Sequence, residues 1–313
     1  MNNTIYYDSS VNDDVRRQQL FEGQLFVYSP RPSTLAFCEF ARRLIQDAFG
    51  NLDPRIAQDH LPVEEYAAIL GTLKPAFIHH PESKRHIQNI FMEMGCDLEK
   101  SYFDVPKMRS STSGGYLTTG IAYAWHPHRD TWYSAPPCQV NWWIPIFDIE
   151  ADNAMAFHAR YWSQAVQNNS SSYNYYQWNK QHRGPSVTQY LKEDPRPLPK
   201  ATESLELDPQ IRIICPVGGI IMFSGSQLHS SVPNTSGQTR FSIDFRTVHL
   251  DDVSAKRGAP NLDAACTGTV LRDFLRGSDF ARMPEELVAL YDDGTASEGE
   301  PIYQPHDINQ TSR

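Results

Sequence analysis

The chain has 313 residues, 40% of them hydrophobic, and carries a formal net charge of −9 with a pI near 5.6. This length can bury a large core, and one decorated catalytic domain over residues 1–290 is the simplest organisation. The acidic balance and the lack of a Lys/Arg-rich run speak against nucleic acid as a partner, because a negative surface repels the phosphate backbone.

The first twenty residues and the cysteines indicate a reducing compartment. Acidic residues stand where a secretory signal would carry basic ones, and no stretch approaches the roughly 18 apolar residues that span a bilayer. The five cysteines are scattered and form no C-x-x-C pair, which argues against a disulfide framework and a zinc ribbon. We therefore expect a cytoplasmic protein with no membrane partner, and the sequence leaves a homo-oligomer open.

The first third of the chain is predicted to be helical. Apolar residues recur near helical spacing over 34–48, where Ser33 is the candidate N-cap, and again over 63–73 and 82–94. These segments lie within about 30–97. We expect them to be helices that support a sheet.

From about residue 98 the pattern changes to short runs rich in aromatic and β-branched residues, which is typical of strands. The predicted strands are 101–109, 117–126, 138–147, 153–160, 211–215, 218–224 and 239–249. Many short strands without alternating helices favour an antiparallel sandwich or barrel. We predict a mainly β (α+β) fold, a double-stranded β-helix (a jelly roll, or cupin-like barrel) over about 98–250, with supporting N-terminal helices.

Two further segments flank or interrupt this core. Residues 161–210 form a polar, turn-rich insertion, and a loop of this length is usually a lid, a binding loop or disorder. The sequence does not choose between a lid and disorder. C-terminal helices are predicted over about 260–290, and 291–313 is a polar tail with few apolar residues.

The segment GIAYAWHPHRD, residues 120–130, contains two candidate metal ligands. On a strand, side chains at i and i+2 point to the same face, so His128 and Asp130 can converge on one ion while Arg129 points away. His229, which follows an apolar strand and a Gly-Ser turn, is the third candidate. Two histidines and one carboxylate on one face leave three coordination positions open, as iron oxygenases require.

Arg240 follows His229 by eleven residues, and Ser242 shares its face of the apolar strand TRFSIDF. Both are expected to face the interior, where a buried arginine needs a counter-ion. A dicarboxylate cosubstrate would supply one in bidentate geometry. Alone, H-x-D could be a solvated turn, His229 a core histidine and Arg240 a partner of Asp244, but their combination favours a metal site.

This combination of H-x-D, a distant histidine and R-x-S resembles the pattern of iron(II)/2-oxoglutarate-dependent dioxygenases. The spacing, with Asn234 after the histidine, is most similar to the phytanoyl-CoA dioxygenase-like branch, and the resemblance covers about residues 100–250. It implies Fe(II) as the metal, 2-oxoglutarate as cosubstrate and O2 as co-reactant. The residues it assigns are His128, Asp130 and His229 to the iron, and Arg240 and Ser231 to 2-oxoglutarate, with Ser242 of the R-x-S pattern also predicted to bind the cosubstrate.

Neighbouring strands supply further candidates. In QVNWWIPI, residues 139–146, Asn141 and Trp143 share a face and are predicted to line the cosubstrate site. The family often has a basic residue on the strand before H-x-D, and Lys107 or Arg109 could serve. The residues predicted to line the substrate pocket are Tyr123, His126, Trp132, Arg109 and Gln139.

The chain also departs from the family. The insertion 161–210 does not match the usual short stretch after this strand, and nothing suggests a handle for coenzyme A, so phytanoyl-CoA is not inferred as substrate. The halogenases of the superfamily have Gly or Ala at the carboxylate position. Asp130 therefore points to oxygenation.

The sequence as a whole predicts an oxygenase that oxidises a small polar organic substrate, by default through hydroxylation, with release of succinate and CO2. Desaturation, ring closure and demethylation stay open. One alternative is a cupin-type metalloenzyme using His126, His128 and His229, although RDTWYSA lacks the glutamate that cupins generally need. The other is a non-enzymatic jelly roll that binds a small molecule without metal.

Overall fold

The structure is a computed structural model that describes residues 4–119, 126–182, 188, 190–191 and 193–292. None of the described helices combines the length and hydropathy that crossing a membrane requires. All five cysteines are free thiols, as their scattered positions predicted.

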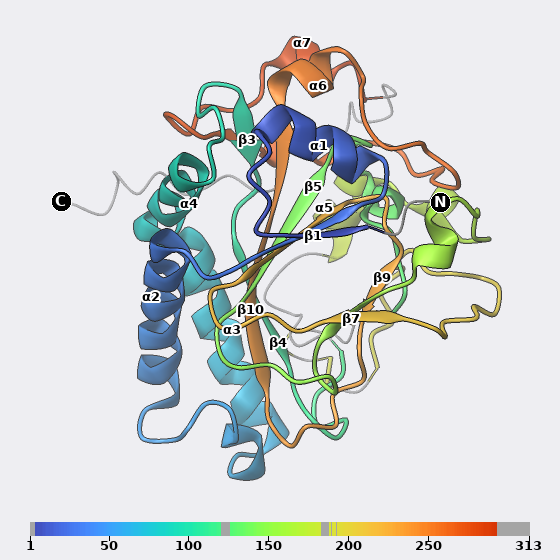
Figure 1. The fold of residues 1–313 in the computed structure, drawn as a ribbon. Coiled ribbons are helices and arrows are strands. Elements are labelled where there is room, and N and C mark those ends of the chain that lie inside the picture. The colour runs from blue at the N-terminus through green and yellow to red at the C-terminus, as the bar shows by residue number, and fades with distance from the viewer. Residues whose placement is uncertain (1–3, 120–125, 183–187, 189, 192, 293–313) are drawn as a thin grey trace.

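An antiparallel sheet forms the centre of the molecule, and only its β1–β2 edge is parallel (Figure 1). Its strands run in the order β1 (Ile5–Tyr7), β2 (Leu25–Tyr28), β8 (Ile220–Ser224), β5 (Val140–Pro145), β10 (Arg240–His249), β3 (Ser101–Phe103) and β11 (Leu275–Arg276), and β4 (Lys107–Ser111) also pairs with β10. A second sheet has the order β7 (Ile211–Ile213), β6 (Met155–Phe157), β9 (His229–Ser231). The fold is thus a sheet-dominated α+β fold, and closure into a double-stranded β-helix stays a prediction.

Three long helices cover one face of the large sheet (Figure 1): α2 (Pro32–Phe49), α3 (Val63–His79) and α4 (Pro81–Glu93). Their buried faces join the core around Trp142 and Phe245, whose rings stack at 5.3 Å. The helical prediction for this region is therefore confirmed, with two corrections. The N-cap of α2 is Arg31 rather than Ser33, and α3 continues past Pro75, which is exposed and does not end the helix.

The predicted strands 138–147, 218–224 and 239–249 are present as β5, β8 and β10. The segment 101–109 divides into β3 and β4, and the segments 153–160 and 211–215 keep only three paired residues each. Of the predicted strand 117–126, residues 117–119 form no strand and 120–125 lie outside the described residues. The short helix α1 (Asp13–Phe21) and strands β1 and β2 were not predicted, since segments this short carry little periodicity.

The segment 260–290 contains little helix, which corrects the prediction made for it. It holds α7 (Glu285–Val288), one 3-10 turn at Val270–Asp273 and β11. The breakers Pro260, Gly268, Gly277 and Pro284 divide it into pieces too short for regular helices. The remaining helices are α5 (Tyr175–His182), inside the insertion 161–210, and α6 (Leu250–Ser254), directly after β10.

Candidate metal centre and its pocket

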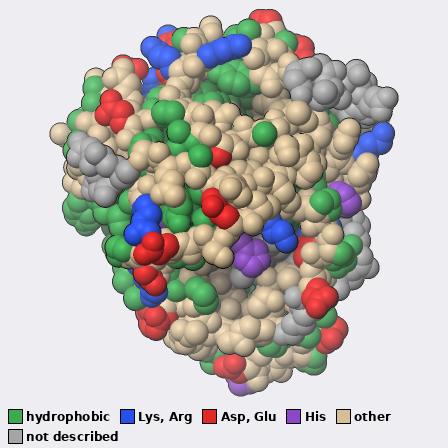
Figure 2. All heavy atoms as spheres, turned by 90° about the vertical axis from the view of Figure 1, so that its right-hand side faces the viewer, with side chains coloured by type: hydrophobic (Ala, Val, Ile, Leu, Met, Phe, Trp, Pro, Cys, Tyr) green, Lys and Arg blue, Asp and Glu red, His purple; other side chains and the backbone are tan. Residues whose placement is uncertain are grey.

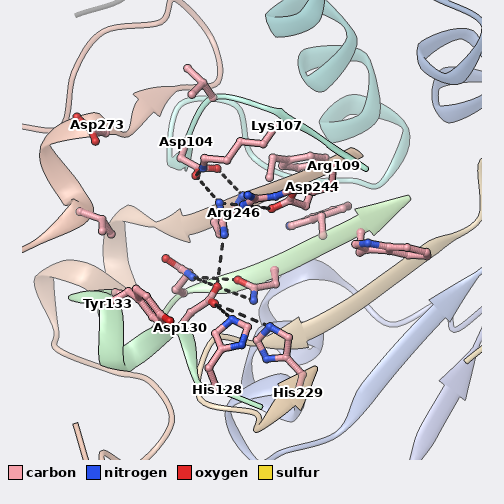
Figure 3. A pocket seen from close by; sticks show the side chains of 18 of the residues that line it. Asp104, Lys107, Arg109, His128, Asp130, Tyr133, His229, Asp244, Arg246 and Asp273 are labelled. Atoms are coloured by element: carbon pink, nitrogen blue, oxygen red, sulfur yellow. Dashed lines mark hydrogen bonds and ion pairs between the residues drawn. The ribbon is translucent and has the colours of Figure 1, made fainter. Parts of the chain in front are cut away.

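The three predicted ligands, His128, Asp130 and His229, lie together and are buried (Figure 3). His128 and His229 form an isolated antiparallel bridge, in which each backbone N–H donates to the other residue's carbonyl at 3.0 Å. Asp130 Oδ1 lies 3.4 Å from His128 Nε2 and 3.9 Å from His229 Nε2. The potential ligand atoms are all within 4.8 Å of one another, so one small cation can contact all three.

Backbone carbonyls orient both imidazoles. Nδ1 of His128 lies 2.8 Å from the carbonyl of His126, and Nδ1 of His229 lies 2.9 Å from that of Gln227. Because a carbonyl can only accept, each Nδ1 carries a proton and each Nε2 keeps its lone pair for a metal. Burial lowers the pKa of His229 to about 3, so this ligand is neutral at physiological pH.

The two oxygens of Asp130 have different surroundings. Oδ2 accepts hydrogen bonds from Gln139 Nε2 at 2.9 Å and Asn141 Nδ2 at 2.8 Å, and Arg246 Nε lies 3.6 Å away. Burial opposes ionisation, but the positive charge of Arg246 helps to outweigh it, and the pKa of Asp130 lies below its usual range. Asp130 is therefore a carboxylate whose Oδ1 faces the two histidines. Asn141 and Gln139 line the pocket as predicted, and both also orient this ligand.

The residues after Asp130 leave the strand alternation. Asp130–Tyr133 form a 3-10 turn, in which side chains repeat every three residues. Trp132 is consequently turned into the core, where its Nε1 donates to Asp263 at 2.7 Å, which corrects its prediction as a pocket residue. Tyr133, which was not predicted, lines the pocket instead and meets the His128 ring edge-on at 5.6 Å.

His126 is exposed and is not among the residues that line the pocket, which corrects its predicted place there. The strand bridge pairs only His128 with His229, so the alternation assumed for residues 126 and 128 does not hold. The carboxylate of Asp130 occupies the third position that the cupin alternative gave to His126. Tyr123, the other predicted pocket residue on this segment, lies outside the described residues.

Arg129 points away from the ligands, as the alternation predicted, and is almost fully buried. Its Nε lies 3.0 Å from Asp263, and its terminal nitrogens donate to the carbonyls of Ser226 and Tyr161, each at 2.5 Å. The residue between two ligands thus connects the ligand segment to the insertion and to the C-terminal segment.

The candidate ligands face a cavity of about 370 Å³. β4, β5 and β10 contribute part of its lining, and the insertion 161–210 and the segment 270–274 contribute another part. The insertion residues in the lining are Tyr173, Tyr175, Trp178, Asn179, Arg196 and Leu198. The described parts of the insertion therefore include pocket walls. On the face drawn in Figure 2, acidic and basic side chains are interspersed over the described residues.

Arg240 lies at the start of β10, and its guanidinium carbon lies 5.6 Å from the centre of the Trp143 ring. It donates to the carbonyl of Asn153 at 2.8 Å and to Ser231 Oγ at 3.2 Å. Among the described residues no carboxylate lies within 4 Å of Arg240, because Asp244 pairs with Arg109 at 2.7 Å instead. Burial lowers the pKa of Arg240 to about 10, as expected for a cation that lacks a close counter-ion.

Two buried polar atoms in this region have no hydrogen-bond partner among the described residues: Nε of Arg240 and Oγ of Ser242. A buried group left unsatisfied costs about 1–3 kcal/mol, so the unused Nε of Arg240, a residue of the cavity lining, indicates a missing ligand. Arg240, Ser231 and Trp143 line the cavity. Ser242 is fully buried and not part of its lining, which corrects its predicted place beside the cosubstrate.

Lys107 and Arg109 both line the cavity, within an ion-pair network that the sequence did not predict (Figure 3). Lys107 contacts Asp104, and Arg246 bridges Asp104 at 3.2 Å and Asp244 at 3.4 Å. A signal for Arg246 was present, because it continues the i+2 series of Arg240, Ser242 and Asp244 in RFSIDFR. Lys74, from α3, also lines the cavity and had no local signal.

No family model and no curated protein matches the chain. Among solved structures, it is similar to EvdO2 from Micromonospora carbonacea var. aurantiaca, at 10% identity over 78% of this chain and 93% of that chain, with a TM-score of 0.44. It is also similar to the non-heme alpha ketoglutarate dependent carbocyclase SnoK from nogalamycin biosynthesis, at 12% identity over 81% and 94% of the chains, with a TM-score of 0.38. Likeness at these scores is loose. The phytanoyl-CoA dioxygenase-like branch stays a prediction.

Proposed function

We propose that the protein is an iron(II)- and 2-oxoglutarate-dependent oxygenase that oxidises a small polar organic substrate. One observation carries the proposal: a buried His128–Asp130–His229 set shares a cavity with Arg240, a buried arginine that has no carboxylate partner among the described residues. A buried His-Asp-His set and a buried arginine without a carboxylate partner each also occur in other kinds of site. Their presence in one cavity is what favours this chemistry.

The donor set fits Fe(II). Two imidazole nitrogens and one carboxylate oxygen are the ligands of non-haem iron oxygenases, whereas a structural zinc site usually has four protein ligands. Gln139 and Asn141 occupy Oδ2 of Asp130, which leaves Oδ1 for the metal. Asp130 would therefore hold the metal through Oδ1, together with the Nε2 atoms of His128 and His229.

The anion site fits 2-oxoglutarate. Arg240 offers a guanidinium with an unused Nε, and the hydroxyl of Ser231 lies beside it. Trp143 covers the guanidinium and limits the access of water. When bound, Fe(II) and 2-oxoglutarate would supply the activation of O2, with release of succinate and CO2. The protein orients both groups, and hydroxylation of a nearby C–H bond is the default outcome.

The exposed side chain of His126 favours this proposal over a cupin-type metalloenzyme that uses His126 as a ligand. The metal-free binding protein is disfavoured by the same buried set, because two histidines placed around a buried carboxylate are costly to assemble without a ligand to bind.

The test is metal content and succinate release. We expect protein purified without O2 to bind one Fe(II) and to release succinate from 2-oxoglutarate, most strongly with one member of a panel of small metabolites. His128→Ala and Asp130→Ala should abolish both, whereas His60→Ala, at an exposed histidine outside the site, should abolish neither. A protein that takes up no iron, or full turnover in both ligand variants, would refute the proposal.

A further inference from the structure

One wall of the cavity carries more positive than negative charge. It consists of Lys74, Lys107, Arg109 and Arg246 together with Asp104 and Asp244, and all six line the cavity. We call this set the basic wall. Its side chains come from α3, from the segment before β4, and from β4 and β10, and five of the six are seen above the candidate metal ligands in Figure 3.

Each carboxylate of the basic wall contacts more than one cation. Asp104 contacts Lys107 and lies 3.2 Å from Arg246, and Asp244 lies 2.7 Å from Arg109 and 3.4 Å from Arg246. Arg246 also approaches the proposed iron ligand Asp130, at 3.6 Å. With four cations and two carboxylates, the basic wall has a formal charge of +2.

The proposed iron and cosubstrate do not offset this excess. Fe(II) and Arg240 bring three positive charges, and Asp130 with the dicarboxylate 2-oxoglutarate brings three negative ones. That unit is neutral in itself. The excess charge of the basic wall therefore calls for an anion from another source.

The pKa values of the two lysines in the basic wall are lowered, as expected where positive charge is in excess. Burial, together with the charge of Arg246, lowers the pKa of Lys107 to about 8. Burial and the charge of Arg109 likewise lower the pKa of Lys74 to about 7. A bound carboxylate would counter both effects, because an opposite charge nearby favours the ionised amine.

The insertion side of the cavity is aromatic. The Tyr133 and Tyr173 rings meet edge-on at 5.6 Å, and Tyr173 lies 6.2 Å from Trp178. The acid on this side, Asp273, accepts a hydrogen bond from Tyr175 and lies apart from the basic wall in Figure 3. Arg196, also in the lining, forms a buried ion pair with Asp194.

We propose that the substrate is a small organic acid whose carboxylate binds the basic wall, and whose flat apolar part lies against Tyr133, Tyr173 and Trp178. This inference rests on the proposed function and deepens it, because it names the substrate class of the same site. The candidate ligands border both surfaces, since Asp130 lies 3.6 Å from Arg246 and the His128 ring lies 5.6 Å from the Tyr133 ring. The bond to be oxidised would therefore belong to the part of the substrate that joins its carboxylate to its flat part.

Benzoate and benzamide form a matched pair of probes, since they share a ring and differ in charge. We would load the protein with Fe(II) and saturating 2-oxoglutarate without O2 and titrate each probe by calorimetry. Benzoate should bind at least tenfold more tightly than benzamide. Lys107→Met should weaken benzoate binding about tenfold, Lys107→Arg should retain most of it, and Lys180→Met, at an exposed lysine of α5, should change nothing.

Three results would overturn the inference: no benzoate binding, equal binding of the two probes by the unaltered protein, or a Lys107→Met variant that loses affinity for 2-oxoglutarate and not for benzoate. The last result would assign the basic wall to the cosubstrate. Failure of the proposed function is distinguishable, since it is seen in iron and 2-oxoglutarate binding before any probe is added. If the protein binds iron and 2-oxoglutarate but binds benzoate and benzamide equally, only the inference about the substrate class fails.

Discussion

At the scale of single residues, the candidate site depends on how the two oxygens of one carboxylate are used. Oδ2 of Asp130 is held by Gln139 and Asn141, and Oδ1 faces the two histidines. Partners of this kind commonly contribute to metal affinity, because they fix the orientation of the donor atom.

Asn141→Ala should therefore weaken metal binding without removing a ligand. We expect metal affinity to fall about 10- to 100-fold, the usual effect of losing such a partner. Titration of the protein with Co(II), followed by its visible absorption, measures this. Asn51→Ala, in an exposed turn, is the control, and an unchanged affinity in Asn141→Ala would show that Gln139 alone suffices.

The variant Arg240→Lys tests whether the shape of the guanidinium, and not only its positive charge, is needed to bind 2-oxoglutarate. Lysine keeps the charge but loses the planar fork that binds a carboxylate through two nitrogens. We expect the KM for 2-oxoglutarate to rise tenfold or more while the iron content stays the same. If the KM does not change, Arg240 does not bind the cosubstrate.

At the scale of elements, the buried pair of Arg129 and Asp263 joins three separate segments. Asp263 accepts from Arg129 Nε at 3.0 Å, from Trp132 Nε1 at 2.7 Å and from the backbone N–H of Val166 at 2.9 Å. The ligand segment, the insertion and the C-terminal segment thus meet at one carboxylate. The packing of the pocket walls is coupled to the position of the ligands.

Asp263→Ala should destabilise the fold, because it leaves Arg129 buried without its counter-ion. Breaking a buried pair in this way typically costs about 3–5 kcal/mol. Urea unfolding measures the loss, and limited proteolysis should cut the insertion faster than in the unaltered protein. Asp59→Ala, at an exposed residue, is the control. A loss no larger than that of the control would mean that this carboxylate does not hold the segments together.

At the scale of the whole molecule, metal binding and folding should be linked, since the ligands come from segments about 100 residues apart that meet only in the folded chain. A metal at 100 times its Kd stabilises the folded state by about 2.7 kcal/mol. We expect Mn(II) to raise the Tm by several degrees and a chelator to reverse the rise. Asp130→Ala should show no such shift; an equal shift in this variant would place the metal elsewhere.

The metal-free protein should also lose stability in mild acid. The folded-state pKa of His229 is about 3, below the ordinary value of about 6.5, so the unfolded chain takes up this proton first. The free energy of unfolding therefore keeps its full value, as far as His229 is concerned, above pH 6.5. It falls as the pH drops toward 3, by at most about 1.4 kcal/mol per pH unit. Urea unfolding between pH 7 and pH 4 measures this. His229→Gln should flatten the dependence, and an equal slope in that variant would assign it to other groups.

The sequence by itself determined the ligand trio, Arg240 and the sheet-rich middle of the chain. These depend on local regularities: strand alternation places His128 and Asp130 on one face, and a polar residue after an apolar strand marks His229. The same rule failed for Trp132 and His126, where the backbone leaves the strand conformation and alternation no longer applies.

Only the tertiary structure decided which distant side chains share the cavity. Lys74 reaches it from a helix, and Asp104 of the segment between β3 and β4 meets Arg246 of β10 there. Asp263 joins Arg129 from a segment more than 100 residues later. Such contacts depend on how whole elements pack, and packing depends on shape and burial summed over the molecule, which no local spacing encodes. The sequence therefore predicted the candidate metal ligands, whereas the charge of their pocket became visible only in the fold.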